Sequence, residues 1–320
     1  MIFALALTFF AASIQPAAAE KVLKLGHMMP LVSVEQSCAL KFKELVETRS
    51  NGRLKIEIYP AGQLGRDKDI LEALQFGTLD LGVITTSPQT NFAKEIGVLD
   101  VPYLFRDWDH VGKLMHADFY DSLLSSTEKA MFYNFCLLPR GFRNVTNNTR
   151  PIVEPSDLNG LKIRVIESPV FVDTFKALGA SPQAMSWGEV FTALQQGAID
   201  GQENAMITIY DEHVYEVQKY VSNTRHIFAF ASLCGSKMLF DGYPKEDQDL
   251  IRQAAKDTAE SMMGVVRADV KKVEDKLVAK GMLVNDVNAD AFRSVIKPVQ
   301  EKIAKDYSED FFNKIKALAE

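Results

Sequence analysis

One arginine interrupts a strand-like run of the sequence, LKIRVI at residues 161–166. Because side chains alternate between the two faces of a strand, Arg164 lies on the face opposite Ile163 and Val165. Glu167 follows just past the end of the run. In α/β sheets, ligands bind at the carboxyl ends of strands, where a planar guanidinium can hold a carboxylate through two hydrogen bonds. The alternative is that Arg164 is an ordinary surface residue and Glu167 a solvated acid.

Two more side chains stand at the ends of expected elements. Trp187 comes at the start of a helix expected from Ser186, and Asn204 follows the strand-like segment AIDGQE. Each also has an ordinary structural explanation, because Trp187 could be a core residue and Asn204 a turn former. Together with Arg164 they supply one fixed cation, one aromatic wall and one amide. This combination indicates a concave binding site.

Signatures of catalysis are mostly missing from the chain. There is no GxSxG, HExxH, P-loop or GxGxxG motif. The densest polar stretch, RDWDHVGKLMHADFYD, holds several acids and two histidines, but a spacing of six places His110 and His116 on different faces of a helix. Helix caps and solvated surface explain that stretch better than a metal site. We expect a protein that is not an enzyme and that uses no metal or cofactor.

Two competing hypotheses remain open. An exported hydrolase or lyase would use Glu167, Asp67 or a histidine as a general base, but nothing in the sequence supplies a nucleophile held by a base and an orienting group. The other hypothesis keeps the same binding site and makes the protein the ligand-sensing partner of a signalling receptor.

The composition is that of an ordinary globular protein with a small negative charge. At 320 residues the chain is roughly twice the ~150 residues typical of one domain, which predicts two lobes. It carries 36 basic against 42 acidic residues, and no Lys/Arg run could follow a phosphate backbone, so nucleic acid is not an expected partner. Three cysteines without a CxxC pair argue against a disulfide framework and favour packing roles for Cys38, Cys136 and Cys234.

Residues 1–19, MIFALALTFFAASIQPAAA, have the pattern of an export signal. The apolar stretch is too short to span a bilayer, and Ala17 and Ala19 precede the expected cleavage before Glu20. No Lys or Arg precedes the apolar run, which would fit a signal that starts upstream of Met1. The alternative is a buried N-terminal helix. No later segment has about 20 consecutive apolar residues.

Strand and helix patterns alternate along the chain. In the first part we expect strands at 22–27, 54–60 and 79–85, with helices at 33–49, beginning with a Ser33–Gln36 capping box, and at 67–76. The same order returns from residue 161, with helices at 170–178 and 186–197 and a second capping box at Ser186 and Glu189. This alternation predicts a parallel α/β sheet.

An internal echo supports two lobes on one plan. LEALQFGTLDLG at 71–82 matches FTALQQGAIDGQ at 191–202, and each contains a helix end, a glycine stop and a short strand. Common helix-stop chemistry could also produce this match by coincidence. Residues 244–281 predict one long helix or two abutting ones, which at ~1.5 Å per residue would exceed about 50 Å and brace both lobes.

The ordered motifs of the mature chain resemble one family. They are YPAGQLG, LEALQFGTLDLG, LDVPYLF, GFRNVTN, DLNGLKIRV and ALGASPQAMSWGEVFTALQQGAIDGQEN. The chain carrying them is similar to the DctP-type solute-binding proteins of tripartite ATP-independent periplasmic (TRAP) transporters. The resemblance implies an α/β, two-lobed periplasmic binding protein fold with a long helix bridging both lobes. It also implies a periplasmic protein, a small organic acid ligand, and delivery of that ligand to a membrane permease driven by an ion gradient.

On this basis we expect residues 20–141 and 230–269 to form the first lobe and residues 142–229 and 270–320 the second. The default expectation for the oligomeric state is a monomer.

The resemblance also assigns roles to single residues. In the family, the arginine of the KIRV motif pairs with the substrate carboxylate, which implies this role for Arg164. Arg143, in GFRNVTN, matches a second basic position that often reaches the same ligand. Asn204 matches an asparagine that hydrogen-bonds the ligand, and Trp187 an aromatic wall. Four further residues match cleft positions whose identity varies with the substrate: Met28, Asp67, Thr85 and Glu167.

Departures from family patterns narrow the expected substrate. Met28 offers no hydrogen bond where sialic-acid binders have a polar side chain, and neither Met28 nor Met29 supplies the acid found in ectoine binders. Glu167 could accept a hydrogen bond from a ligand hydroxyl or ammonium group. The sequence therefore favours a hydroxylated or amino-bearing carboxylate, such as a sugar acid or hydroxy acid, over a plain dicarboxylate.

Overall fold

The computed structural model describes residues 20–319, so the export signal predicted at residues 1–19 lies outside the described part. The centre of the fold is a sheet in which the strands follow the order β2-β1-β3-β9-β4-β7-β5-β6. The described strands are β1 Lys21–Gly26, β2 Leu54–Tyr59, β3 Leu81–Thr85, β4 Phe132–Asn147, β5 Lys162–Val165, β6 Ser181–Ala184, β7 Gly201–Ala205, β8 Tyr220–Asn223, β9 Phe228–Ser236 and β10 Leu283–Asp286.

The strand order is symmetric about its middle. β1 pairs in parallel with β2 and β3, and β5 pairs in parallel with β6 and β7. Between these two sets, β9 and β4 run antiparallel to each other and to the outer neighbours, β3 and β7. The predicted parallel pairing is present in each of the two sets, but the sheet as a whole is mixed, because the chain crosses between the sets once along β4 and returns along β9.

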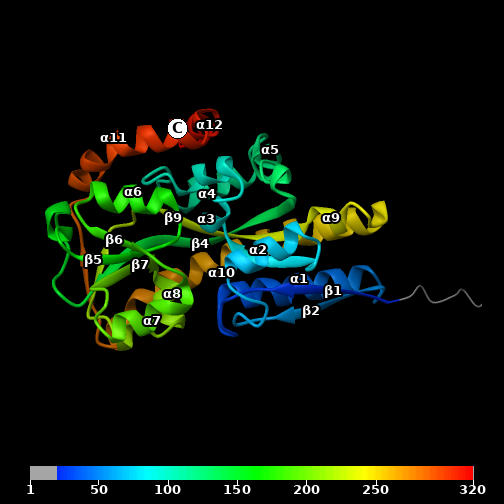
Figure 1. Cartoon of the computed structure of the whole chain (residues 1–320), viewed down its shortest axis with the longest axis horizontal. Helices are drawn as coiled ribbons and strands as arrows, with labels where there is room; N and C mark the ends of the chain where they lie inside the picture. Colours follow the sequence, from blue (N-terminus) through cyan, green and yellow to red (C-terminus); the bar gives the residue numbers. More distant parts are fainter. Residues whose placement is uncertain (1–19, 320) are drawn as a thin grey trace, which may run out of the picture.

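Helices cover this sheet, and the molecule has two lobes arranged along its long axis (Figure 1). α1 and α2 lie with β1–β3, whereas α6, α7 and α8 lie with β5–β7. The described α-helices are α1 Val34–Arg49, α2 Asp67–Gln75, α3 Thr86–Gln89, α4 Trp108–Met115, α5 Tyr120–Ser125, α6 Pro169–Ala177, α7 Trp187–Gln195, α8 Met206–Asp211, α9 Lys237–Phe240, α10 Lys245–Ala279, α11 Ala289–Tyr307 and α12 Glu309–Ala317. None of these helices has both the length and the apolar character needed to cross a bilayer.

The predicted long helix is one continuous helix, α10, of 35 residues. It packs on α1 in one lobe and on α8 and β10 in the other. Buried side chains of α10, including Ile251, Val266 and Leu277, belong to one apolar cluster with residues of α1 and α8. α10 therefore braces both halves of the sheet, as predicted.

The internal echo reflects repeated local structure. α2 ends before Gly77 and leads into β3, and α7 ends before Gly197 and leads into β7. Both glycines have positive φ, +68° and +67°, a conformation that favours glycine over residues with a Cβ atom. The two segments occupy equivalent places in the symmetric strand order, so common helix-stop chemistry alone does not account for the match.

The predicted capping boxes are only partly present. Ser33 caps α1, because its Oγ accepts from the Gln36 backbone N–H at 3.2 Å, but the Gln36 side chain contacts His27 at 2.8 Å instead of closing the box. Ser186 occupies the N-cap position of α7 without a side-chain cap hydrogen bond, so the box predicted there was wrong.

The polar stretch at 106–121 has structural roles. Asp107 caps α4 by accepting from the His110 backbone N–H at 2.8 Å, and His110 Nε2 contacts the Ile315 carbonyl oxygen at 2.8 Å.

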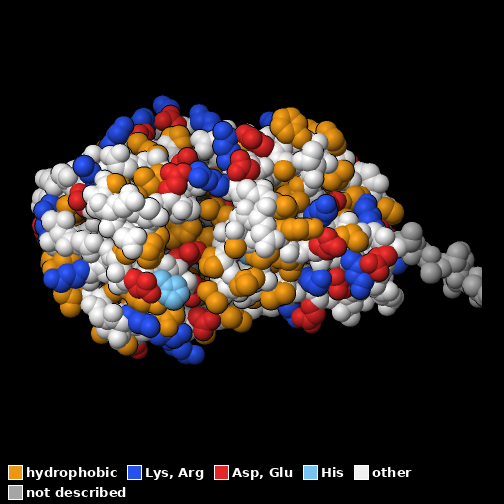
Figure 2. Space-filling model, turned by 60° about the horizontal axis from the view of Figure 1, so that its bottom comes forward, with side chains coloured by type: hydrophobic (Ala, Val, Ile, Leu, Met, Phe, Trp, Pro, Cys, Tyr) orange, Lys and Arg blue, Asp and Glu red, His pale blue; other side chains and the backbone are white. Residues whose placement is uncertain are grey.

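All three cysteines are buried and free. On the face shown in Figure 2, acidic and basic side chains are interspersed over the surface.

Candidate functional site

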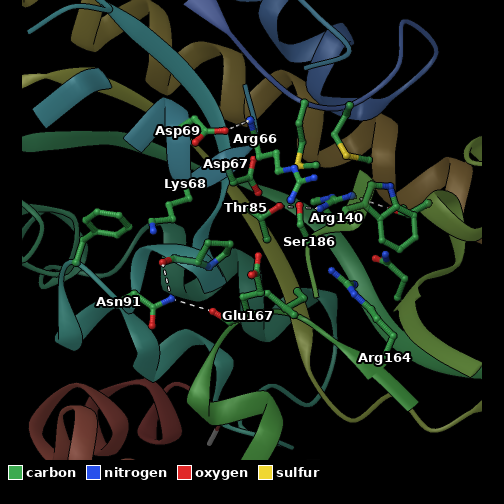
Figure 3. A pocket seen from close by; sticks show the side chains of 18 of the residues that line it. Arg66, Asp67, Lys68, Asp69, Thr85, Asn91, Arg140, Arg164, Glu167 and Ser186 are labelled. Carbon is green, nitrogen blue, oxygen red and sulfur yellow. Dashed lines mark hydrogen bonds between the residues drawn. The ribbon is translucent and has the colours of Figure 1, made fainter. Parts of the chain in front are cut away.

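A cavity of about 510 Å³ lies between the two lobes, a size within the usual range for small-molecule sites. It opens at the carboxyl ends of β1, β3, β5 and β7 and at the amino ends of α2 and α7. All eight residues selected from the sequence line it: Met28, Asp67, Thr85, Arg143, Arg164, Glu167, Trp187 and Asn204. Figure 3 shows side chains from both lobes pointing toward this space.

Arg164 is a buried cation without an acidic partner among residues 20–319. It is 3% exposed, and its Nε and Nη2 donate to the Met185 carbonyl oxygen at 2.9 and 2.7 Å. Burial lowers the pKa of Arg164 to about 10, while the negative charge of Glu203 opposes this effect. The guanidinium is therefore charged at neutral pH, and its Nη1 is not used by these bonds.

Trp187 lies beside this cation, and Asn204 lines the same cavity. The Trp187 ring centroid is 5.3 Å from the Arg164 guanidinium carbon, which holds the guanidinium plane by a cation–π contact. The Asn204 Oδ1 accepts from the Ala205 backbone N–H at 2.9 Å. This bond uses the acceptor side of the amide, so the Asn204 NH₂ is the group left to donate to a ligand.

Arg143 carries a charge that is balanced within the protein. Its Nη2 donates to both Oε1 and the backbone oxygen of Glu203, at 2.8 and 2.7 Å, and its Nε donates to Glu203 Oε2. His226 Nε2 lies 3.1 Å from the same carboxylate. Burial raises the pKa of Glu203, but Arg143 and His226 outweigh it and hold that pKa below its usual value. Arg143 lines the cavity as one half of a buried ion pair.

Arg140 is a cavity residue that the sequence analysis missed. In β4 the register shifts between Pro139 and Gly141, and Arg140 is the extra residue of this bulge. In a regular strand, residues 140 and 143 would point to opposite faces, whereas here both line one cavity. The only hint in the sequence was the PRGFR pattern, which places a proline and a glycine around the arginine.

Asp67 is a buried carboxyl group at the amino end of α2. Burial raises the pKa of Asp67 to about 7, against the opposing effects of Arg140, Arg164 and the Thr85 hydroxyl. Figure 3 shows Asp67 and Thr85 close to Arg140, with Arg164 and Glu167 elsewhere around the cavity. The cavity thus has two polar regions of different chemistry.

Glu167 and Met28 stand nearer solvent. Glu167 is exposed, and its backbone oxygen accepts from the Asn91 side chain at 2.8 Å. Met28 is partly buried. Across the cavity, Arg66 of the α2 N-cap contacts Glu189 of α7 through Nη1 and Oε1 at 2.6 Å. Both bonds join one lobe to the other.

Within residues 20–319, no group of three His, Cys, Asp or Glu residues is arranged to hold a metal ion. The buried Arg164 guanidinium gives one region of the cavity the character of an anion site, and the Asp67 carboxyl gives another region a titratable group.

A family model described as bacterial extracellular solute-binding protein, family 7 (DctP), matches residues 25–306. A solute-binding protein of Roseobacter denitrificans is 35% identical over 281 residues, covering 88% of this chain and 86% of the relative. A solved structure of a TRAP periplasmic solute-binding protein from that organism, with bound L-galactonate, is 32% identical, has a TM-score of 0.86 and covers 95% of this chain and 100% of its own.

Two further solved structures carry different acids. A TRAP periplasmic solute-binding protein from Polaromonas, bound to D-erythronate, has a TM-score of 0.89 at 33% identity and covers 93% of this chain and 99% of its own. One from Shewanella oneidensis, with bound succinate, also has a TM-score of 0.89 at 28% identity, covering 94% and 100%. Ligands in similar folds therefore include both hydroxylated monocarboxylates and a plain dicarboxylate.

Proposed function

Because this chain belongs to the DctP family of bacterial extracellular solute-binding proteins, the ligand-capturing components of TRAP transporters, we propose that Arg164 binds the carboxylate of its ligand. The observation that carries this proposal is the buried guanidinium of Arg164, which has no acidic partner among the described residues. A buried charge is costly unless it is paired, so an anionic ligand completes the site. Asn204 adds a donor in the same cavity, and Trp187 adds a wall beside the guanidinium.

The charge balance favours a ligand with one carboxylate. Arg143 is neutralised by Glu203, and Arg140 lies 2.9 Å from Glu35. Of the three buried arginines that line the cavity, Arg164 is the one left without a carboxylate partner among the described residues, and the Glu167 carboxylate would repel a second ligand carboxylate. The ligand is a hydroxylated monocarboxylate, a sugar acid or hydroxy acid, consistent with the erythronate and galactonate of similar structures.

Further parts of the proposal concern location and partners. The protein is exported to the periplasm, its signal is cleaved near Ala19, and it works as a monomer. It delivers the ligand to the membrane permease of its transporter. Family membership supports the extracytoplasmic location and the role in transport.

The first experiment identifies the ligand. Native mass spectrometry of gently purified protein gives the mass of any bound molecule, and denaturation releases it for identification. We expect a hydroxylated monocarboxylate. If the protein is empty, a thermal-shift screen of sugar acids, hydroxy acids and dicarboxylates follows. Stabilisation by succinate but by no hydroxylated acid would refute the proposed ligand class.

The same preparation tests for enzymatic activity. A binding protein returns its ligand unchanged after long incubation, which chromatography of the released acid detects. Conversion of the bound acid by purified protein would instead support the hydrolase or lyase hypothesis.

A further inference from the structure

A second polar region of the cavity is built around Arg140. Its Nη1 donates to Thr85 Oγ1 at 3.2 Å and its Nη2 donates to Thr208 Oγ1 at 2.8 Å. Thr85 ends β3 of one lobe, and Thr208 lies in α8 of the other. One guanidinium therefore holds a hydroxyl group from each lobe at the cavity wall, and both threonines line the cavity.

The charge of Arg140 is already balanced. Its Nε lies 2.9 Å from Oε1 of Glu35 in α1, and both side chains are buried. The two atoms are close without the alignment of a good hydrogen bond, so the pair acts through charge more than through a directed bond. An arginine neutralised in this way is poorly suited to bind a second ligand carboxylate.

The hydrogen-bond inventory gives the threonines a defined role. A hydroxyl group has one hydrogen to donate and two lone pairs to accept with. Each threonine oxygen accepts from Arg140, which turns the hydroxyl so that its own hydrogen points toward another partner. The Thr85 hydroxyl bonds to Asp67, which keeps a further oxygen as an acceptor, whereas the Thr208 hydrogen is available to a ligand. Donors and acceptors side by side match alcohol groups, because an alcohol both donates and accepts.

We propose that Arg140 is a positioning residue that makes the cavity select hydroxylated acids, by orienting Thr85 and Thr208 toward hydroxyl groups on the ligand chain away from its carboxylate. This inference rests on the proposed function, in which Arg164 holds the carboxylate. Figure 3 shows Thr85, Arg140 and Asp67 grouped together, apart from Arg164. The selection for hydroxyl groups thus has a structural cause separate from the binding of the carboxylate.

Two probes separate the two roles. Erythronate carries hydroxyl groups on all three carbons beyond its carboxylate, whereas 2-hydroxybutyrate keeps only the first. We expect the wild-type protein to prefer erythronate. Arg140→Gln should weaken erythronate binding by at least about tenfold and change 2-hydroxybutyrate binding by less than about threefold. Arg164→Gln should weaken the binding of both acids by a similar factor. Competition titrations give the ratio of variant to wild-type dissociation constant for each of the two variants with each of the two acids.

Further variants guard against misfolding and against a pure charge effect. Arg140→Met with Glu35→Gln removes both members of the buried pair, so no charge is left unpaired, and should show the same loss of preference. Arg140→Lys keeps a positive charge near Glu35 but cannot bridge two threonines with a planar fork, and should also lose it. Unchanged melting temperatures confirm folding.

The outcomes are distinct. An undiminished preference for erythronate in the folded Arg140 variants, or an equal loss for both acids, overturns the inference while leaving the proposed function intact. Failure of the wild-type protein to bind erythronate, galactonate or 2-hydroxybutyrate refutes the proposed ligand class, and the inference falls with it.

Discussion

The three buried arginines of the cavity differ in how their charges are balanced. Arg143 is paired with Glu203 and Arg140 with Glu35, whereas Arg164 donates only to a carbonyl oxygen. A carbonyl orients a guanidinium without neutralising it. Arg164 therefore keeps its charge for a ligand, and the other two arginines shape the site around it.

Asp67 gives a pH-dependent prediction at the same scale. Its pKa in the folded chain is about 7, above an unfolded value near ~3.9, so the folded form retains a proton that the unfolded form has lost. The contribution of this group to stability is therefore full below about pH 4 and is lost as the pH rises to about 7. Asp67→Asn should raise the melting temperature of ligand-free protein by an amount that grows across this range and then levels off.

The measurement is the difference in melting temperature between variant and wild type from pH 4.5 to 8. Asp290→Asn, at a fully solvated position, serves as the control and should show no trend. A constant difference across the range would mean that Asp67 is not the buried, protonated group described here.

Single residues could be predicted from the sequence when they stood at the ends of elements. Arg164 and Asn204 lie one residue before the carboxyl ends of β5 and β7, Trp187 begins α7, and the structure brings all three to one cavity. Arg140 could not be predicted, because its direction depends on a bulge set by pairing with β9. Glu203 was equally hidden, since its role depends on a partner 60 residues away.

At the scale of elements, the cavity is formed by equivalent pieces of two lobes. α2 and β3 on one side correspond to α7 and β7 on the other, and the amino ends of both helices face the cavity. Helix amino ends favour negative charge, so this arrangement suits an anionic ligand. The repeat was visible in the sequence, because glycine stops and helix patterns are local. The antiparallel crossing of β4 and β9 was not, since it depends on contacts far apart in the chain.

The Arg66–Glu189 ion pair joins these two helices across the cavity. Both side chains are about half exposed, 55% and 50%, so the pair contributes at most about 1 kcal/mol. Because it forms only when the lobes are together, Glu189→Gln should speed ligand dissociation by up to about fivefold with little effect on folding. Glu189 does not line the cavity, so direct ligand contacts are spared.

Stopped-flow dissociation at low and high salt measures this effect. The dissociation rate should depend less on salt in Glu189→Gln than in the wild type, because salt screening and the mutation weaken the same ion pair. Asp290→Asn, which breaks an ion pair within α11, is the matched control. A dissociation rate equal to the wild-type rate at low salt would contradict a closing role for the pair.

At the scale of the whole molecule, β4, β9 and α10 run between the two lobes, and the remaining strands belong to one side or the other. The lobes are thus joined by these three continuous elements, and one apolar cluster includes residues of α1 and α8 from the two sides. The lobe boundaries expected from the sequence remain a prediction. Buried side chains within residues 96–124, which were expected in the first lobe, belong to one apolar cluster with side chains of residues 145–178 and 292–315, which were expected in the second.

Ligand binding should close and stabilise the molecule. We expect a bound acid to reduce the radius of gyration measured by small-angle X-ray scattering, because contacts such as Arg66–Glu189 form between lobes. At 100 times its dissociation constant, the ligand should add about 2.7 kcal/mol of stability. Melting curves across a concentration series check this value. A scattering profile unchanged by saturating ligand would indicate lobes that are fixed relative to each other.

The central claim is that Arg164 holds the ligand carboxylate. Calorimetric titration of the acid identified by mass spectrometry into wild-type protein, Arg164→Ala and the remote variant Arg293→Ala tests it most directly. We predict that Arg164→Ala folds normally and loses about 2–5 kcal/mol of binding free energy, because the carboxylate is then buried without its partner. Arg293→Ala should bind like the wild type. Near-wild-type affinity of Arg164→Ala would contradict the claim and make Arg164 a structural residue.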